Sequence, residues 1–192
     1  MKLAVYGYGG HAREVAAQIG QPVTFFVDDK YVTSETESIS KFDPTEYSIM
    51  VTVADSRDRF DIVQRLPKET IYFTFIHPSA LILDHNIVVG EGSFIGANSI
   101  LTTNIRIGKH AILNRGNQIG HDTTIGDYFS AMPGAIVSGN VTIYDCVYLG
   151  TNSSVKEKIS IHSLTTIGMN SCVVKSIKEP GVYIGTPTKQ IK

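Results

Sequence analysis

Aliphatic side chains recur at every sixth position through the second half of the chain. The 16 members of this series are Leu83, Val89, Ile95, Leu101, Ile107, Leu113, Ile119, Ile125, Ala131, Val137, Ile143, Leu149, Val155, Ile161, Ile167 and Val173. Four positions after most of them stands a small or β-branched residue, such as Ser93, Ala111 or Thr123. A six-residue period fits no helical face, and it is typical of a parallel β-helix. The pattern therefore predicts an all-β, left-handed parallel β-helix, in which three six-residue faces close one triangular coil of about 18 residues.

Residues 1–76 follow a different pattern, in which apolar strands alternate with helical segments. Strands are expected at Lys2–Tyr6, Val23–Val27, Ser48–Val53 and Thr70–Ile76, and helices at His11–Ile19 and Arg57–Leu66. Alternating strands and helices are typical of a parallel α/β sheet. We therefore expect a half-Rossmann α/β domain here, with an irregular loop over residues 31–47.

These two patterns divide the chain into three parts. Residues 1–76 are expected to form an α/β domain, and residues 77–179 the β-helix. His77-Pro78 marks the junction, because proline restricts the backbone of the residue before it. Residues 180–192 are expected to form a tail that leaves the prism through Pro180-Gly181.

Composition narrows the class of protein. The chain carries 17 Lys+Arg against 18 Asp+Glu, so no nucleic-acid partner is expected. No apolar run is long enough to predict a membrane-spanning helix, and the N-terminus is unlike a signal peptide. Two cysteines without a paired motif predict neither a zinc site nor a disulfide framework. We expect a cytoplasmic protein, and charged residues at only 18% suggest buried contacts between subunits.

A glycine-rich loop, Gly7-x-Gly9-Gly10, lies between the first strand and the first helix. Backbone N–H groups in such a loop can receive an anion. Asp28 and Asp29 end the next strand, where a carboxylate can accept hydrogen bonds from a ribose or a base. The chain has no second half for a dinucleotide, so a nucleoside diphosphate joined to a sugar fits better than NAD. Alternatively, the glycines only permit a tight turn.

His121 is the candidate catalytic residue of the β-helix. It points outward two positions after Ile119, and Asp122 follows directly. A neutral imidazole can accept a proton, and an adjacent carboxylate can fix its tautomer. Gly139 is placed one coil above His121 by the period of the repeat, where its N–H could stabilise an oxyanion. An outward histidine can equally be part of a solvated surface.

Two further observations concern metals and subunits. No third histidine has a spacing that would bring it beside both His110 and His121, so no metal is expected. Thr151 and Met169 are also separated by one coil, but they fall on another face of the prism. A ligand that touches both this pair and the pair His121 and Gly139 needs a groove between subunits. Such a groove predicts a cyclic homotrimer.

Three sequence segments together resemble the sugar acyltransferases of the NeuD/PglD type. They are AVYGYGGHAREV at the start, VDDK after the second strand, and ILNRGNQIGHD within the repeats. The resemblance covers essentially the whole chain in the right order. Proteins of this type act on nucleotide-linked amino sugars, and the group is named after a sialic acid O-acetyltransferase.

The resemblance implies a role for each candidate residue. His121 is similar to the catalytic base, Asp122 to its orienting carboxylate, and Gly139 to the oxyanion donor. Substrate-binding positions are implied at Gly9, Gly10, His11, Asp28, Asp29, Lys30 and Asn114. Positions that line the acetyl-CoA channel are implied at Gly139, Thr151, Met169, Gly185 and Pro187. Met169 replaces a glycine that is common in the family.

The expected activity is transfer of acetyl from acetyl-CoA to the amine, at C4, of a UDP- or dTDP-linked 4-amino-4,6-dideoxyhexose for surface glycan or O-antigen synthesis. No cysteine or serine is placed to form an acyl-enzyme, so direct transfer is expected. Two alternatives remain open. One is O-acetylation of a sugar hydroxyl, as in the sialic acid branch. The other is a non-catalytic nucleotide-sugar-binding protein.

Overall fold

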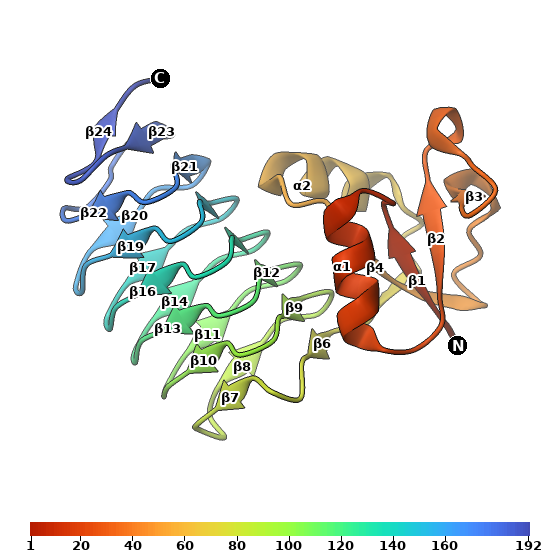
Figure 1. Cartoon of the computed structure of the whole chain (residues 1–192), viewed down its shortest axis with the longest axis horizontal. Coiled ribbons are helices and arrows are strands. Elements are labelled where there is room, and N and C mark those ends of the chain that lie inside the picture. Colours follow the sequence, from red (N-terminus) through yellow and green to blue (C-terminus); the bar gives the residue numbers. More distant parts are fainter.

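A computed structural model describes residues 1–192 and shows two parts side by side, a small α/β sheet and a prism of short strands (Figure 1). The small sheet has five parallel strands in the order β3-β2-β1-β4-β5. Its elements are β1 Lys2–Tyr6, α1 Gly10–Ile19, β2 Val23–Val27, β3 Glu37–Ser38, β4 Tyr47–Val51, α2 Ser56–Arg65 and β5 Ile71–Tyr72. None of the helices is long and apolar enough to cross a bilayer.

Capping residues fix the start of α2 and the end of α1. Asp55 caps α2, because its carboxylate accepts hydrogen bonds from the N–H groups of Arg57 and Asp58 at 2.9 and 3.0 Å. α1 ends at Gly20, whose φ of +66° lies in the left-handed region that glycine adopts most easily. The apolar face of α1 packs against β1 and β4, where Val15 and Met50 are fully buried.

The predicted parallel strands are present, and the two predicted α-helices accompany them. The chain between β2 and β4 was expected to be a loop; it contains the short β3 and the 3₁₀ turns Asp29–Tyr31 and Ile39–Lys41. The predicted strand over 70–76 divides into β5 in the small sheet and β6 (Phe75–Ile76) in the prism. The finer assignment as a half-Rossmann domain, and the domain bounds, stay predictions.

The prism has three faces, each a sheet whose strands are parallel apart from one C-terminal strand. The first face contains β6, β9 Phe94–Ile95, β12 Ile112–Leu113, β15 Ser130–Ala131, β18 Tyr148–Leu149, β21 Thr165–Ile167, β23 Gly181–Ile184 and β24 Lys189–Gln190. The second contains β7 Leu81–Ile82, β10 Ile100–Leu101, β13 Gln118–Ile119, β16 Ile136–Val137, β19 Ser154–Val155 and β22 Cys172–Val173. The third contains β8 Val88–Val89, β11 Arg106–Ile107, β14 Thr124–Ile125, β17 Thr142–Ile143 and β20 Ser160–Ile161. This architecture is consistent with the predicted β-helix.

The register of the strands matches the predicted coil. Leu113 pairs with Ile95 below and Ala131 above. Residues that pair between neighbouring coils are therefore three members apart in the aliphatic series. From Ile95 to Val173 every member of the series is at most 3% exposed. The small residues four positions later, such as Ser93 and Thr123, are also fully buried. The interior is therefore a stack of aliphatic side chains with small side chains near the corners.

The first member of the aliphatic series does not point into the prism, so this part of the prediction is wrong. Leu83 is 63% exposed, and it is the neighbouring Ile82 that pairs with Leu101. One extra residue therefore lies in the first coil, between Ile82 and Val89. This residue shifts the frame, because each inward position is set by the strand that it pairs with.

The tail differs from its expected course. Instead of leaving the prism, β23 pairs in parallel with β21 and continues the first face. β24 then folds back antiparallel on β23. The backbone groups of the last full coil on this face are thereby paired instead of exposed.

The small α/β sheet is docked on the lower first face of the prism, where Phe94 and Ile112 join its core (Figure 1). At the centre of this contact Arg59 of α2 is 0% exposed. Its guanidinium donates to the carbonyl oxygens of His110, Tyr128 and Phe129 at 2.8, 2.8 and 3.0 Å. Burial lowers the pKa of Arg59 to about 10, so the group stays charged at neutral pH. Carbonyl dipoles, not a carboxylate, stabilise this buried charge.

Candidate active site

His121 and Asp122 occupy the corner between the second and third faces of the prism, just after β13. The Nδ1 of His121 lies 2.7 Å from Oδ2 of Asp122. Hydrogen bonds from Asn104 and His121 hold the pKa of the Asp122 carboxyl below its usual range. An ionised carboxylate can only accept here, so Nδ1 carries the proton and Nε2 keeps its lone pair. In the neutral ring, Nε2 is therefore the nitrogen left to accept a proton.

Gly139 lies one coil above, against the ring of His121. A Cβ at position 139 would lie 2.5 Å from Nε2 and 2.7 Å from Cε1 of His121. The N–H of Gly139 donates to no acceptor within the chain. A proton acceptor and an unpaired backbone donor therefore lie next to one another, as the sequence predicts for a base and an oxyanion donor.

The period of the coil also identifies a residue that was not predicted from the sequence. Asn104 lies one coil below Asp122, and its side-chain amide donates to Asp122 Oδ1 at 2.7 Å. Subtracting one coil from Asp122 would have found it, just as adding one coil to His121 found Gly139.

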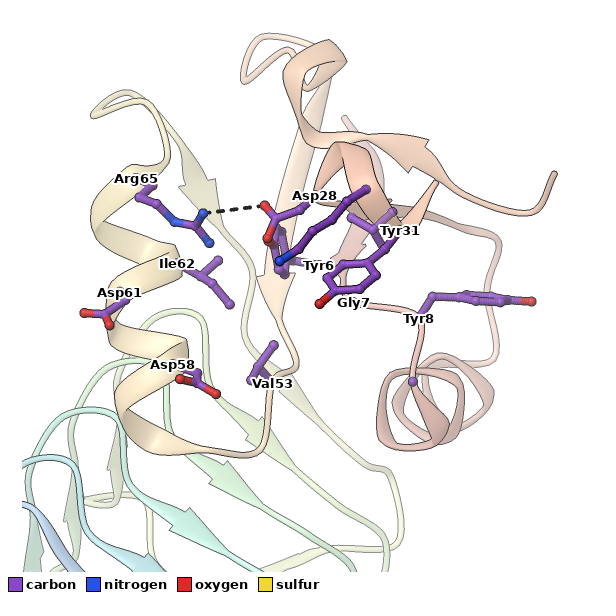
Figure 2. A pocket seen from close by; sticks show the side chains of 13 residues that line it. Tyr6, Gly7, Tyr8, Asp28, Tyr31, Val53, Asp58, Asp61, Ile62 and Arg65 are labelled. Carbon is purple, nitrogen blue, oxygen red and sulfur yellow. Dashed lines mark ion pairs between the residues drawn. The ribbon is translucent and has the colours of Figure 1, made fainter. Parts of the chain in front are cut away.

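A cleft of about 740 Å³ opens at the carboxyl ends of β1 and β2, beside α2 (Figure 2). Of the predicted substrate-binding residues, Gly9, Asp28 and Lys30 line it. Gly10 begins α1, and Asp29 bonds the hydroxyl of Ser38, so neither lines the cleft. The other lining residues are Tyr6, Gly7, Tyr8, Val27, Tyr31, Val53, Asp58, Asp61, Ile62 and Arg65. The cleft lies next to the predicted glycine loop.

The polar groups of the cleft include both hydrogen-bond acceptors and donors. Asp28 and Arg65 face one another from β2 and α2, with Oδ1 and Nη1 3.5 Å apart (Figure 2). Burial, and then a hydrogen bond to Asp28, raise the pKa of Tyr6 to about 12. Lys30 Nζ lies 4.8 Å from the ring centre of Tyr31. Gly7 has a φ of +110°, which makes glycine necessary at this turn. The cleft could bind a ligand that carries both donors and an anionic group.

His11 faces the prism instead of the cleft. Its Nδ1 lies 3.5 Å from Nδ2 of Asn114, which follows β12 at the corner between the first and second faces. Burial, followed by the charges of Arg59 and Arg115, lowers the pKa of His11 to about 4. Its Nε2 is buried without a partner. A neutral imidazole with one unused nitrogen therefore lies beside Asn114, and the structure brings these two predicted residues together.

Apart from Gly139, the predicted acetyl-CoA residues lie higher on or next to this same corner. Thr151 follows β18, and its carbonyl oxygen accepts the N–H of Asn170 at 2.9 Å. Met169 lies beside it with its side chain 72% exposed. The tail runs next to this corner, because Gly185 donates its N–H to Ser171 Oγ at 3.0 Å, just before Pro187. Thr151, Met169 and the tail turn are therefore neighbours.

One chain does not bring all of these groups together. His121, Asp122 and Gly139 lie at the corner between the second and third faces, whereas Asn114 and Thr151 lie at the corner between the first and second. The second face separates the two corners. The small sheet packs on the first face (Figure 1), whereas the corner that carries His121 lies between the other two faces.

The six histidines do not gather around a common point. No group of three His, Cys, Asp or Glu side chains is placed to hold a metal ion. The ring of His110 is buried and stacks on Tyr128 with the ring centres 5.1 Å apart. His110 is thus part of the contact between the two halves of the chain.

No family model and no curated protein matches the chain. Solved structures match it over its full length. WeeI from Acinetobacter baumannii AYE is 27% identical, with a TM-score of 0.89 and 100% of each chain covered. The acetyltransferase domain of PglB from Neisseria gonorrhoeae FA1090 is 25% identical, with a TM-score of 0.87 and 99% of each chain covered. PerB from Caulobacter crescentus, in complex with CoA and GDP-perosamine, has the same fold at 24% identity and a TM-score of 0.89, covering 100% of this chain and 98% of PerB.

The predicted resemblance to the sugar acyltransferases is confirmed. With it, the prediction of an enzyme is confirmed. The roles of individual residues stay predictions, and they are taken up below.

Proposed function

We propose that this enzyme transfers acetyl from acetyl-CoA to the amine of a nucleotide-linked amino-dideoxy sugar. The observation that carries the proposal is the position of His121 Nε2 against Gly139, with Nδ1 bonded to Asp122. This pairing supplies the two things that attack of an amine on a thioester needs. One is a base for the ammonium proton, and the other is a donor for the oxyanion.

The proposed reaction is direct. The lone pair of the sugar amine attacks the thioester carbon, and the carbonyl oxygen becomes an oxyanion that accepts the N–H of Gly139. His121 Nε2 takes one amine proton, and Asp122 stabilises the resulting imidazolium. Collapse of the intermediate breaks the C–S bond, and the proton passes from His121 to the departing thiolate. The products are the amide and CoA.

Acetyl-CoA as donor is supported by the solved structures. The PglB acetyltransferase domain, 25% identical here, has also been crystallised with acetyl coenzyme A, with a TM-score of 0.68. PerB was crystallised with CoA. In this chain we assign the channel to Thr151, Met169, Gly185 and Pro187, next to Gly139 of a neighbouring subunit. The exposed Met169 side chain would then narrow the channel at that point.

A nucleotide-linked sugar as acceptor is supported by the cleft beside the glycine loop. We assign Gly9, Asp28 and Lys30, which line this cleft, to the nucleotide, with Asp28 at the base. His11 and Asn114, which lie against each other, are assigned to the sugar. PerB binds GDP-perosamine, which is a nucleotide sugar of this kind. For this chain we propose a UDP- or dTDP-linked 4-amino-4,6-dideoxyhexose, acetylated at C4 for surface glycan or O-antigen synthesis.

We propose a homotrimer because the two corners are separated on one chain. His121 and the acetyl-CoA residues lie at different corners of one prism, so a complete site needs the corner of a second chain. A cyclic trimer of parallel prisms creates three such grooves, each with one corner of each kind. Each active site would then take its base from one subunit and its nucleotide cleft from the next.

A thiol-release assay tests the activity. Acetyl-CoA is offered with a panel of UDP-, dTDP- and GDP-linked 3- and 4-amino-dideoxy sugars, with free sialic acid alongside. Thiol release with one amino sugar supports the proposal and identifies base and position. Turnover of sialic acid alone would indicate O-acetylation instead. Absence of both turnover and CoA binding would indicate a nucleotide-sugar-binding protein without this activity.

A further inference from the structure

Asn104 and Asp122 occupy equivalent turns of successive coils. Both have left-handed backbones, with φ of +51° and +58°. Their side chains meet, because the Asn104 amide donates to Asp122 Oδ1 at 2.7 Å. The other carboxylate oxygen, Oδ2, lies 2.7 Å from His121 Nδ1. Each carboxylate oxygen of Asp122 therefore has one hydrogen-bond partner.

We propose that Asn104 is a positioning residue for the general base. A carboxylate held at one oxygen alone can rotate about its side-chain bonds, and its contact with the imidazole then varies. A donor at the second oxygen fixes the plane of the carboxylate, and so fixes the tautomer and direction of the ring. This inference rests on the proposed role of His121.

Asn104 is itself held from below. Its backbone N–H donates to Asp84 Oδ2 at 3.2 Å. The hydroxyl of Thr103 bonds the same oxygen, and the N–H of Asn86 donates to Asp84 Oδ1 at 3.0 Å. Asp84 lies in the segment that contains the extra residue of the first coil. This segment therefore supports the turn that carries Asn104.

The Asn104–Asp122 bond is not a general property of this ladder of turns. Asn140 and Lys158 follow in the next two coils with the same left-handed backbone, at φ of +59° and +60°. Neither side chain makes a hydrogen bond within the chain. Asparagine commonly adopts this conformation, so the backbone alone explains its presence at position 104. The backbone does not explain why its amide meets the carboxylate that holds His121.

The test uses two substitutions that remove the donor. Asn104→Asp keeps the shape of the side chain but offers no N–H, and Asn104→Gly keeps the left-handed turn with no side chain. The matched control is Asn98→Gly, on the same coil at another corner, where φ is +58° and the side chain makes no hydrogen bond. Each variant is assayed for kcat, for both KM values and for the tautomer of His121 by ¹⁵N spectra of the histidine rings. His121→Asn assigns the signal.

We expect kcat to fall about tenfold in Asn104→Gly, with both KM values within about twofold of the wild type. The kcat of Asn104→Asp should fall at least as far, because two carboxylates then face each other. The share of His121 with its proton on Nδ1 should drop in both variants and stay at the wild-type level in Asn98→Gly. The tautomer is measured on the resting enzyme, without turnover. It therefore tests the role of Asn104 even if His121→Asn proves fully active, a result that would disprove the general-base role of His121. With His121→Asn inactive, an unchanged tautomer or an unchanged kcat in Asn104→Gly would overturn the inference.

Discussion

The imidazole of His121 lies against the Cα of Gly139, which belongs to the next coil of the prism. A Cβ at position 139 would stand 2.5 Å from Nε2, closer than side-chain atoms approach one another. A side chain here would therefore displace the neighbouring ring, although the backbone of Gly139, whose φ is not positive, would accept one.

Gly139→Ala should displace the His121 ring and lower kcat by about 100-fold, the usual contribution of a general base. The fold should remain, because His121 is 56% exposed in its side chain and can swing toward solvent. A melting temperature within about 3 °C of the wild type, together with normal CoA binding, would separate loss of catalysis from loss of structure. Wild-type kcat in Gly139→Ala would contradict the proposed geometry.

The buried Arg59 should be important for stability. Arg59→Met would leave the carbonyl oxygens of His110, Tyr128 and Phe129 without this donor in a dry interface. We expect the free energy of unfolding to fall by about 3 kcal/mol, measured by denaturant titration. Arg57→Met on the same helix is the matched control, because Arg57 is exposed and makes a single side-chain bond, to Leu164. It should cost less than about 1 kcal/mol.

Acid should destabilise the contact between the two halves of the chain. Burial, and then the charge of Arg59, lower the pKa of His110 from its usual 6.5 to about 4. The unfolded chain thus binds a proton between pH 6.5 and 4 that the folded chain does not, so stability falls as the pH drops through this window. The loss from His110 should approach about 3 kcal/mol at pH 4. His11, with a pKa also lowered to about 4, adds to it.

The variant His110→Phe tests the origin of this pH dependence. Tyr128 occupies the equivalent left-handed turn one coil above, so such a turn accepts an aromatic ring that does not titrate in this pH range. Denaturation curves between pH 7 and 4 should show a smaller decrease in unfolding free energy for the variant. An identical decrease in the two proteins would place the titrating group elsewhere.

Substitutions of the neighbouring residues Asp28 and Asp29, at the proposed nucleotide cleft, should differ in effect. Asp28 lines the cleft, whereas Asp29 bonds Ser38. Asp28→Asn should raise KM for the nucleotide sugar about tenfold while kcat changes little, because the lost acceptor contacts the nucleotide and not the reacting amine. Asp29→Asn should raise KM less. Equal effects at the two positions would indicate that both carboxylates reach the ligand.

The β-helix was predictable because its period is strict. A coil of fixed length places residues that are one period apart above one another, so His121 and Gly139 could be paired from the sequence. The six-residue period failed only at Leu83. One extra residue in the first coil puts Ile82 in the inward position instead, and because both residues are aliphatic the sequence does not reveal the shift.

Contacts between side chains were less accessible to sequence reasoning. Asp28 and Asp29 are adjacent and identical, and only the 3₁₀ turn that begins at Asp29 directs them apart. Arg59 looks like one more polar residue of α2, because most of its acceptors lie far along the chain, among them the carbonyl groups of His110 and Phe129. Neither feature has a periodic signal in the sequence.

The central claim is that each active site combines His121 of one subunit with the nucleotide cleft of the next. Its most direct test co-expresses, in equal amounts, His121→Asn and the double variant Asp28→Ala/Asn114→Ala, after each alone has been verified to lack acetyl transfer. In a cyclic trimer every mixed assembly holds one intact site of three, so about a quarter of the wild-type acetyl transfer should return. If both groups belonged to one chain, no intact site could form, and the absence of any recovery in verified mixed trimers would contradict the account.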